Sequence, residues 1–202
     1  METRRRDLLK LAGGGLAASL VAAPVLHAAD RADMPQGENA GGVFDIRTFG
    51  AVGDGNAIDT PAVNRAIEAA SSSDGGTVRF PRGTYACYSI HLRSRVTLFL
   101  EQGATILAAP IPMEGASSGF DAPESNAPWE AYQDYGHNHW HNSLMWGENI
   151  HDFCICGPGL IWGKSLDRST SDSAGKPGSA NKAIALKNCH NVVLKDFSIL
   201  QG

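Results

Sequence analysis

Short apolar runs, separated by bends rich in glycine, proline and asparagine, dominate the chain from residue 43 onward. Residues 152–165 read DFCICGPGLIWGKS, in which Gly-Pro-Gly splits two runs of three or four apolar residues. Each run is too short for a helix, and the bend excludes one long strand. The same alternation recurs and predicts short strands at 43–46, 77–80, 84–86, 89–92, 96–100, 104–107, 153–155, 160–162, 182–186, 192–196 and 197–200.

One segment alone has a strong helical pattern, and it comes early. Thr60 is a suitable N-cap, and Pro61 suits the first helical position. A polar Ser/Gly stretch at 71–76 ends the segment. A single helix beside many short strands indicates a cap on a β structure rather than a helix bundle. Its buried stripe is expected to consist of Val63, Ala66, Ile67 and Ala70.

The strand segments repeat one unit. Leu98, Ile155 and Leu194 each follow another apolar residue two positions earlier, and each is followed by a bend and an isoleucine-containing strand. Repetition of a strand–bend–strand unit is typical of a solenoid, in which successive coils stack in parallel. A β-sandwich of hairpins is the alternative, but no Asn-Gly or Asp-Gly turn joins matched strands after the helix. The sequence therefore predicts an all-β fold, a parallel β-helix.

Composition limits the function classes. The chain has 202 residues, of which 43% are hydrophobic and 19% charged, as expected for one globular domain with a real core. The net charge of −4 gives no indication of a nucleic-acid partner.

The N-terminal residues predict export. Residues 1–29 combine a basic segment, an apolar stretch at 11–26 and small residues before Asp30, as in a signal peptide. The apolar stretch is shorter than a membrane span, so no stable insertion is expected. Arg5-Arg6 followed by Leu-Leu-Lys resembles a twin-arginine signal, with an ordinary secretory signal or an uncleaved tether as alternatives. We expect a linker at 30–42, a β-helix domain at 43–202, and a periplasmic or extracellular location.

Four cysteines occur, Cys87, Cys154, Cys156 and Cys189. Cys154 and Cys156 share one face of a predicted strand. A Cys-x-Cys pair without a second ligand pair is a weak metal signal. The sequence therefore predicts small buried hydrophobic residues and no metal site.

Two long excursions interrupt the strands, at 110–142 and 165–181. We expect the first to be functional and the second to be a mobile flap. The interval 129–146, which covers the end of the first excursion, holds closely spaced aromatic and histidine residues. They permit three interpretations: packing of the loop, contact with sugar rings, or a metal site made of histidines on one strand face. His139, Trp140 and His141 are the candidate substrate-binding residues. The full set is Trp129, Tyr132, Tyr135, His137, His139, Trp140, His141 and Trp146.

Single carboxylates near turns are expected to cap those turns rather than act as acids. Glu148, beside Trp146, is a weaker candidate for the binding surface. The expected capping residues are Asp54, Asp59, Asp152 and Asp196.

Several motifs resemble known β-helical enzymes. Residues 44–55 (FDIRTFGAVGDG), 59–62 (DTPA) and 75–85 (GGTVRFPRGTY) resemble the opening of the pectate-lyase-like β-helix superfamily. Residues 157–163 (GPGLIWG) and 188–192 (NCHNV) are similar to glycoside hydrolase family 28, the polygalacturonases and their bacterial relatives.

The resemblance implies a right-handed β-helix whose N-terminal end is capped by the helix from Thr60. It also implies hydrolysis of galacturonate-containing polysaccharide with inversion, by carboxylates that include a general acid. The family carries these groups in Asn-Thr-Asp, Asp-Asp, Gly-His-Gly and Arg-Ile-Lys motifs, and the sequence contains none of the four. We therefore expect no catalytic residue in this chain, and an inactive N-terminal fragment truncated at its C-terminal end that aggregates when produced alone.

Three functions stay open at this point. They are a pectin-directed glycoside hydrolase, a polysaccharide lyase of the same fold, and a non-enzymatic β-helical scaffold that binds carbohydrate. Each has a polysaccharide as its partner, and no cofactor is expected. The sequence does not determine the oligomeric state.

Overall fold

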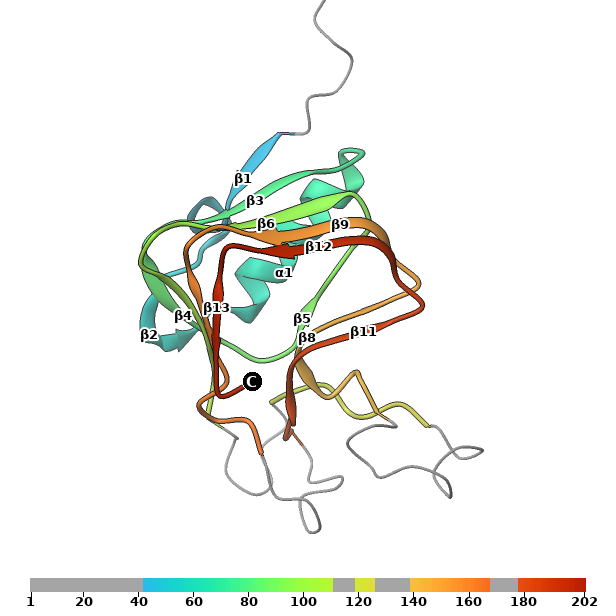
Figure 1. The fold of residues 1–202 in the computed structure, drawn as a ribbon. Helices are drawn as coiled ribbons and strands as arrows, with labels where there is room; N and C mark the ends of the chain where they lie inside the picture. The colour runs from blue at the N-terminus through green and yellow to red at the C-terminus, as the bar shows by residue number, and fades with distance from the viewer. Residues whose placement is uncertain (1–41, 111–118, 126–138, 168–177) are drawn as a thin grey trace, which may run out of the picture. The chain divides into compact units, whose positions relative to one another are not determined.

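The computed structural model describes residues 42–110, 119–125, 139–167 and 178–202, which form a parallel β-helix of three sheets with one α-helix (Figure 1). The predicted signal peptide lies outside the described residues. We name the sheets A, B and C. Sheet A contains β1 (Val43–Asp45), β3 (Gly76–Phe80), β6 (Val96–Leu100), β9 (His151–Cys156) and β12 (His190–Lys195). Sheet B contains β2 (Asp54–Ile58), β4 (Gly83–Cys87), β7 (Ala104–Ala108), β10 (Leu160–Trp162) and β13 (Ser198–Leu200), and sheet C contains β5 (Ile90–His91), β8 (Ser143–Glu148) and β11 (Lys182–Lys187).

The strands stack in register, one coil above the next. Leu98 pairs with Ile155, and Ile155 pairs with Leu194, as neighbours on parallel strands of sheet A. Every strand pair among the described residues is parallel. This confirms the predicted parallel β-helix, including the stacking of Leu98, Ile155 and Leu194.

The interior is a stack of apolar side chains enclosed by the three sheets. Val78, Leu98 and Ile155 from sheet A and Ile106 and Ile161 from sheet B are all fully buried. Side chains alternate between the two faces of each strand, so every second residue reaches this interior. Burial of such ladders is the main source of stability for a solenoid.

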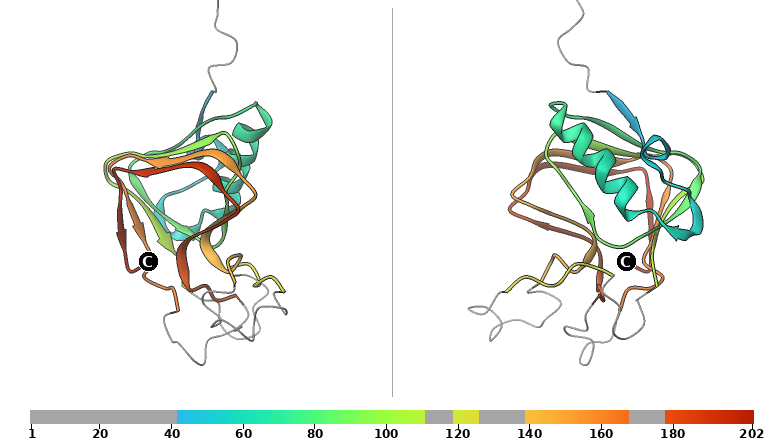
Figure 2. Two further views of the ribbon diagram at one scale, coloured as in Figure 1. Left: turned by 45° about the vertical axis from the view of Figure 1, so that its right-hand side comes forward. Right: turned by 180° about the vertical axis from the view of Figure 1, so that it is seen from behind.

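The helix α1 (Thr60–Ser72) lies across the first coils (Figure 2). The predicted stripe of Val63, Ala66, Ile67 and Ala70 is buried. One detail of the prediction was wrong, because the N-cap position is Asp59 and not Thr60. Thr60 is the first helical residue, and its hydroxyl accepts a hydrogen bond of 2.7 Å from the backbone N–H of Tyr88.

Apart from the connection that contains α1, between β2 and β3, the long connections of the described coils occur at one corner. The bends from sheet A to sheet B and from sheet C to sheet A are short, whereas β7–β8 and β10–β11 are joined by long segments (Figure 2). Both long segments therefore lead from sheet B into sheet C. These are the two predicted excursions, and residues 111–118, 126–138 and 168–177 of them lie outside the described residues.

Two strands were not predicted, and the cysteines differ from expectation. β2 was interpreted as a turn because it begins Asp-Gly-Asn, and β8 was missed beside the long excursion.

Of the four free thiols, Cys87 is buried as predicted, but Cys154 and Cys156 lie on the outer face of sheet A and are partly exposed. Within the described ranges, no helix is long and apolar enough to cross a membrane.

Candidate active-site surface on sheet C

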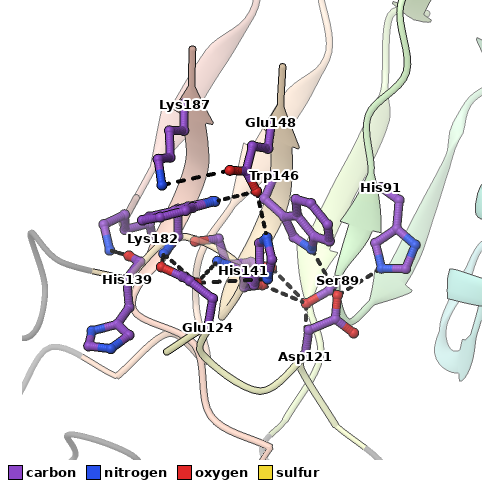
Figure 3. Close-up of polar contacts among 12 residues, drawn as sticks. Ser89, His91, Asp121, Glu124, His139, His141, Trp146, Glu148, Lys182 and Lys187 are labelled. Atoms are coloured by element: carbon purple, nitrogen blue, oxygen red, sulfur yellow. Dashed lines mark hydrogen bonds and ion pairs between the residues drawn. The ribbon is translucent and has the colours of Figure 1, made fainter. Parts of the chain in front are cut away.

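The outer face of sheet C carries a dense group of polar and aromatic side chains (Figure 3). Ile90 and Met145 are fully buried inside the solenoid, so the residues that follow them, His91 and Trp146, point outward. Segments 119–125 and 139–142 contribute further side chains to the same face. We call this group the sheet C cluster; it consists of His91, Asp121, Glu124, Trp140, His141, Trp146, Glu148, Lys182 and Lys187.

Asp121 joins the covering segment to two strands. Its Oδ2 accepts a 2.8 Å hydrogen bond from Trp146 Nε1 and lies 2.7 Å from His91 Nε2. The Asp121 backbone N–H donates to Ser89 Oγ at 2.9 Å, which fixes the direction of the side chain. Burial raises the pKa of Asp121, but the hydrogen bonds from His91 and Trp146 outweigh burial and leave that pKa below its ordinary value.

Glu148 occupies the centre of a second group of contacts. Its Oε2 lies 3.2 Å from His141 Nε2 and 3.4 Å from Trp140 Nε1, and its Oε1 lies 3.7 Å from Lys187 Nζ. Burial raises the pKa of Glu148. The hydrogen bonds from His141 and Trp140, together with the Lys187 charge, reverse that effect and lower the pKa.

Glu124 fixes the backbone just before β8. Its carboxylate accepts hydrogen bonds from the backbone N–H groups of Trp140 and His141, each at 3.0 Å. Lys182 Nζ donates to the His139 carbonyl oxygen at 2.7 Å and holds the same segment from β11. The positions of Trp140 and His141 are thus set by two charged side chains, and charge-assisted bonds of this kind are stronger than neutral ones.

The aromatic rings of the sheet C cluster are engaged with one another. The His141 and Trp146 ring centroids are 4.0 Å apart, and His91 lies 5.1 Å from Trp146 on its centroid distance. Lys187 Nζ sits 3.3 Å from the centroid of the Trp140 ring, in a cation–π contact. One face of Trp140 is therefore occupied by an ammonium group. The contacts among the rings are those that the loop-packing interpretation predicts.

Comparison with known proteins identifies the family. The family described as Rhamnogalacturonase A/epimerase, pectate lyase-like matches residues 43–191. The chain belongs to this family.

Individual relatives agree with this pectate-lyase-like assignment. The chain is 34% identical over 83 residues to an exo-poly-α-D-galacturonosidase of Dickeya chrysanthemi. The aligned region covers 41% of this chain and 12% of that protein. It is 52% identical over 44 residues to a mannuronan C5-epimerase of Azotobacter vinelandii, covering 22% of this chain and 2% of the relative. The chain thus spans only a small share of the curated relatives that it matches.

A solved structure shows the same fold. The family 28 exopolygalacturonase of Yersinia enterocolitica superposes with a TM-score of 0.60 at 20% identity, over 78% of this chain and 34% of that enzyme. That structure is a right-handed β-helix, and the predicted fold class is confirmed. This pectate-lyase-like chain accordingly shares the fold of that exopolygalacturonase.

The three predicted substrate-binding residues have different surroundings in this pectate-lyase-like fold. Trp140 and His141 belong to the sheet C cluster. His139 is 4% exposed, and its ring points away from His141 (Figure 3). Substrate binding by these three residues stays a prediction, and His137, Trp129, Tyr132 and Tyr135 lie outside the described residues.

The metal interpretation requires His137, His139 and His141 to lie on one face of a strand. The structure does not place His139 and His141 on a strand. β8 begins at Ser143, so His139 and His141 precede the strand and do not alternate along it. Within the described part of the chain, no three His, Cys, Asp or Glu side chains are placed to hold a metal ion.

Sequence reasoning missed most of the charged residues in the sheet C cluster. His91 lies on β5 and Lys187 on β11, and pairing of both strands with β8 brings these two residues onto one sheet. Asp121 and Glu124 reach the same face from segment 119–125. A usable signal was present at two strand positions, since His91 follows the buried Ile90 and Trp146 follows the buried Met145. Glu148, in contrast, was a candidate, and it lies at the centre of the cluster.

Two of the predicted turn-capping aspartates do cap turns. Asp54 Oδ1 accepts hydrogen bonds from the backbone N–H groups of Asn56 and Ala57, both at 2.8 Å. The buried Asp59 side chain accepts from the backbone N–H groups of Val52 and Gly53. These contacts account for both carboxylates without any catalytic role.

The lowered pKa of Asp121 predicts a loss of stability in acid. A carboxyl group whose pKa is lower in the folded protein stabilises the fold above its unfolded value of about 3.9, and this contribution disappears as the pH falls through the folded pKa. The melting-temperature difference between the wild type and Asp121→Asn should be constant from neutral pH to about pH 5 and shrink below about pH 4. Thermal melts monitored by tryptophan fluorescence check this, and an unchanged difference at pH 3 would contradict the role of Asp121.

Proposed function

We propose that the protein is an exported glycoside hydrolase that acts on pectin-type, galacturonate-containing polysaccharide. The observation that carries the proposal is the match with the Dickeya exo-poly-α-D-galacturonosidase, because the β-helix fold by itself hosts many activities. The twin-arginine pattern at residues 4–10 supports export to the periplasm or beyond. The activity is proposed for the protein as a whole.

We assign the polysaccharide-binding surface to the outer face of sheet C. Both long connections lead into this sheet, and loops placed by a rigid scaffold are frequent sites of binding. The sheet C cluster offers ammonium, imidazole and indole N–H groups, which suit the carboxylates and hydroxyls of a galacturonate chain. Because Trp140 and Trp146 each already have a partner on one ring face, recognition is proposed to depend on these polar groups more than on stacking.

No catalytic residue is assigned to this chain. The Asn-Thr-Asp, Asp-Asp, Gly-His-Gly and Arg-Ile-Lys motifs are absent from its sequence. Asp121 is bound to His91 and Trp146 and Glu124 to backbone N–H groups, which fixes the covering segments, while Glu148 contacts His141, Trp140 and Lys187. Their proposed part in the reaction is to shape the surface on which the polymer lies.

The reaction products decide between the three function classes. The whole protein, incubated with polygalacturonan, should release reducing ends without the ultraviolet absorbance of unsaturated uronates, and it should leave neutral galactan intact. Absorbing products would show elimination by a lyase. Binding of the polymer without any new chain ends would show a carbohydrate-binding scaffold.

Lys187→Met tests the proposed binding surface. The Lys187 side chain is 39% exposed although its ammonium lies over Trp140 and 3.7 Å from Glu148 Oε1, so a uronate carboxylate can approach it from the solvent side. Loss of one charge contact should weaken binding of polygalacturonate about five- to tenfold, measured by affinity electrophoresis or calorimetry.

Lys164→Met is the matched control. Lys164 also lies over a tryptophan ring, 5.2 Å from the centroid of Trp162, but it follows β10 in sheet B. This variant should bind the polymer as the wild type does. Equal losses in both variants would indicate a general charge effect and contradict the sheet C assignment.

A further inference from the structure

The Cys154 and Cys156 thiols lie side by side on the outer face of sheet A. Phe153 and Ile155, the alternate residues of β9, are buried in the interior, so the two cysteines point outward. Both are partly exposed, whereas Cys87 is fully buried. β9 is a central strand, paired with β6 on one side and β12 on the other.

The two cysteines occupy alternate positions of β9, so their side chains lie on the same face of one strand. Burial, and after it the neighbouring Cys156 thiol, raises the pKa of the Cys154 thiol to about 11. The positive charge of Lys195 acts in the opposite direction. Lys195 is paired in register with Cys156, so an ammonium group lies on the same outer face beside the thiols.

Strand geometry opposes a disulfide between these cysteines. Residues two apart on a strand are separated by about 6.6 Å. A disulfide requires Cβ atoms about 3.8 Å apart, so β9 would have to bend sharply. Pairing with β6 and β12 on both sides holds the strand extended.

We propose that Cys154 and Cys156 form a binding site for a single soft, monovalent metal ion such as Cu(I) or Ag(I). Soft ions select thiolate ligands, and monovalent ions such as Cu(I) and Ag(I), unlike the tetrahedral Zn(II), accept two thiolates in a near-linear arrangement. A site with two ligands suits this surface, because no third His, Cys, Asp or Glu is placed to complete a larger shell there among the described residues.

The binding step balances without redox chemistry. Two S–H bonds break, both protons go to solvent, and two sulfur–metal bonds form. The resulting complex carries one negative charge, which Lys195 offsets from the neighbouring strand. Because two thiols must lose protons, binding should strengthen as the pH rises.

Competition for Cu(I) tests the site in the full chain. The reduced protein is titrated into Cu(I) held by a coloured chelator, and one ion per chain should be withdrawn. Cys154→Ser and Cys156→Ser should each lower the Cu(I) affinity by roughly a hundredfold, since each removes one of two ligands. Cys189→Ser, which removes a partly buried thiol elsewhere, should retain the wild-type affinity.

A second measurement needs no variant. Cu(I) should protect Cys154 and Cys156, but not Cys189, from alkylation by iodoacetamide, as read by peptide mass spectrometry. It should also raise the melting temperature of the wild type and of Cys189→Ser. The proposal is overturned if Cys154→Ser and Cys156→Ser keep the wild-type affinity, if Cu(I) protects neither thiol, or if oxidised glutathione readily links the two cysteines to each other.

Discussion

Gly157→Ala is expected to destabilise the protein by at least about 3 kcal/mol, through backbone strain and steric overlap together. Gly157 has a φ of +102°, in the left-handed region that L-residues with a side chain rarely adopt. A Cβ at this position would overlap the carbonyl oxygen of Leu100, a backbone atom of β6 in the coil below. The coil cannot relieve this contact without moving β6 or β9 out of register.

Gly103→Ala separates the cost of backbone strain from the cost of steric overlap. Its φ of +81° carries a similar backbone cost, but the nearest atom to an added Cβ is Cγ of the Arg82 side chain, at 3.1 Å, which can move. The expected loss is about 1–2 kcal/mol from the conformation alone. Urea unfolding of both variants measures the difference, and equal losses would show that the coils separate easily at the Gly157 bend.

Asp59→Asn is expected to cost about 3 kcal/mol, because it breaks one of two part-buried hydrogen bonds and removes the charge from the acceptor of the other. Asp59 is 2% exposed. Its Oδ1 accepts from the Val52 N–H at 2.7 Å and its Oδ2 from the Gly53 N–H at 3.0 Å. An amide NH₂ group cannot accept a hydrogen bond, so one buried N–H group is left without a partner at the entrance to α1.

Asp54→Asn is the matched control for Asp59. Asp54 is exposed, and a single oxygen, Oδ1, accepts both of its turn hydrogen bonds. An asparagine keeps that oxygen, so the loss should stay below about 0.5 kcal/mol. Chemical denaturation at neutral pH compares the two variants. A small effect of Asp59→Asn would mean that solvent reaches the turn between η2 (Ile46–Phe49) and β2.

The fold could be predicted from the sequence because each strand–bend–strand unit is a short, contiguous stretch of the chain. Leu98, Ile155 and Leu194 each sit in a short alternating run followed by a bend, and parallel stacking aligns them. β8 escaped prediction because its outer face is also covered: Leu144 is fully buried although it alternates with the inward-facing Met145. Strict alternation of polar and apolar residues fails where both faces of a strand are packed.

The candidate site could be predicted only in part, because its contacts depend on tertiary packing. A density of aromatic residues drew attention to Trp140 and His141, but a single outward residue such as His91 or Lys187 has no distinguishing local pattern. The contact between Lys187 and Trp140 depends on the register of β11 against β8, and that register includes the pairing of Lys187 with Glu148. Such information is non-local and is fixed by tertiary packing.

The uneven lengths of the connections also bear on how the chain folds. From Val78 to its partner Leu98 the sequence separation is short, and from Leu98 to Ile155 it more than doubles. Closing the longer loop costs roughly 1 kcal/mol more in chain entropy, and distant contacts form slowly. We therefore expect the coils next to α1 to form the folding nucleus. The later coils would then pair with the strand edge that these first coils expose.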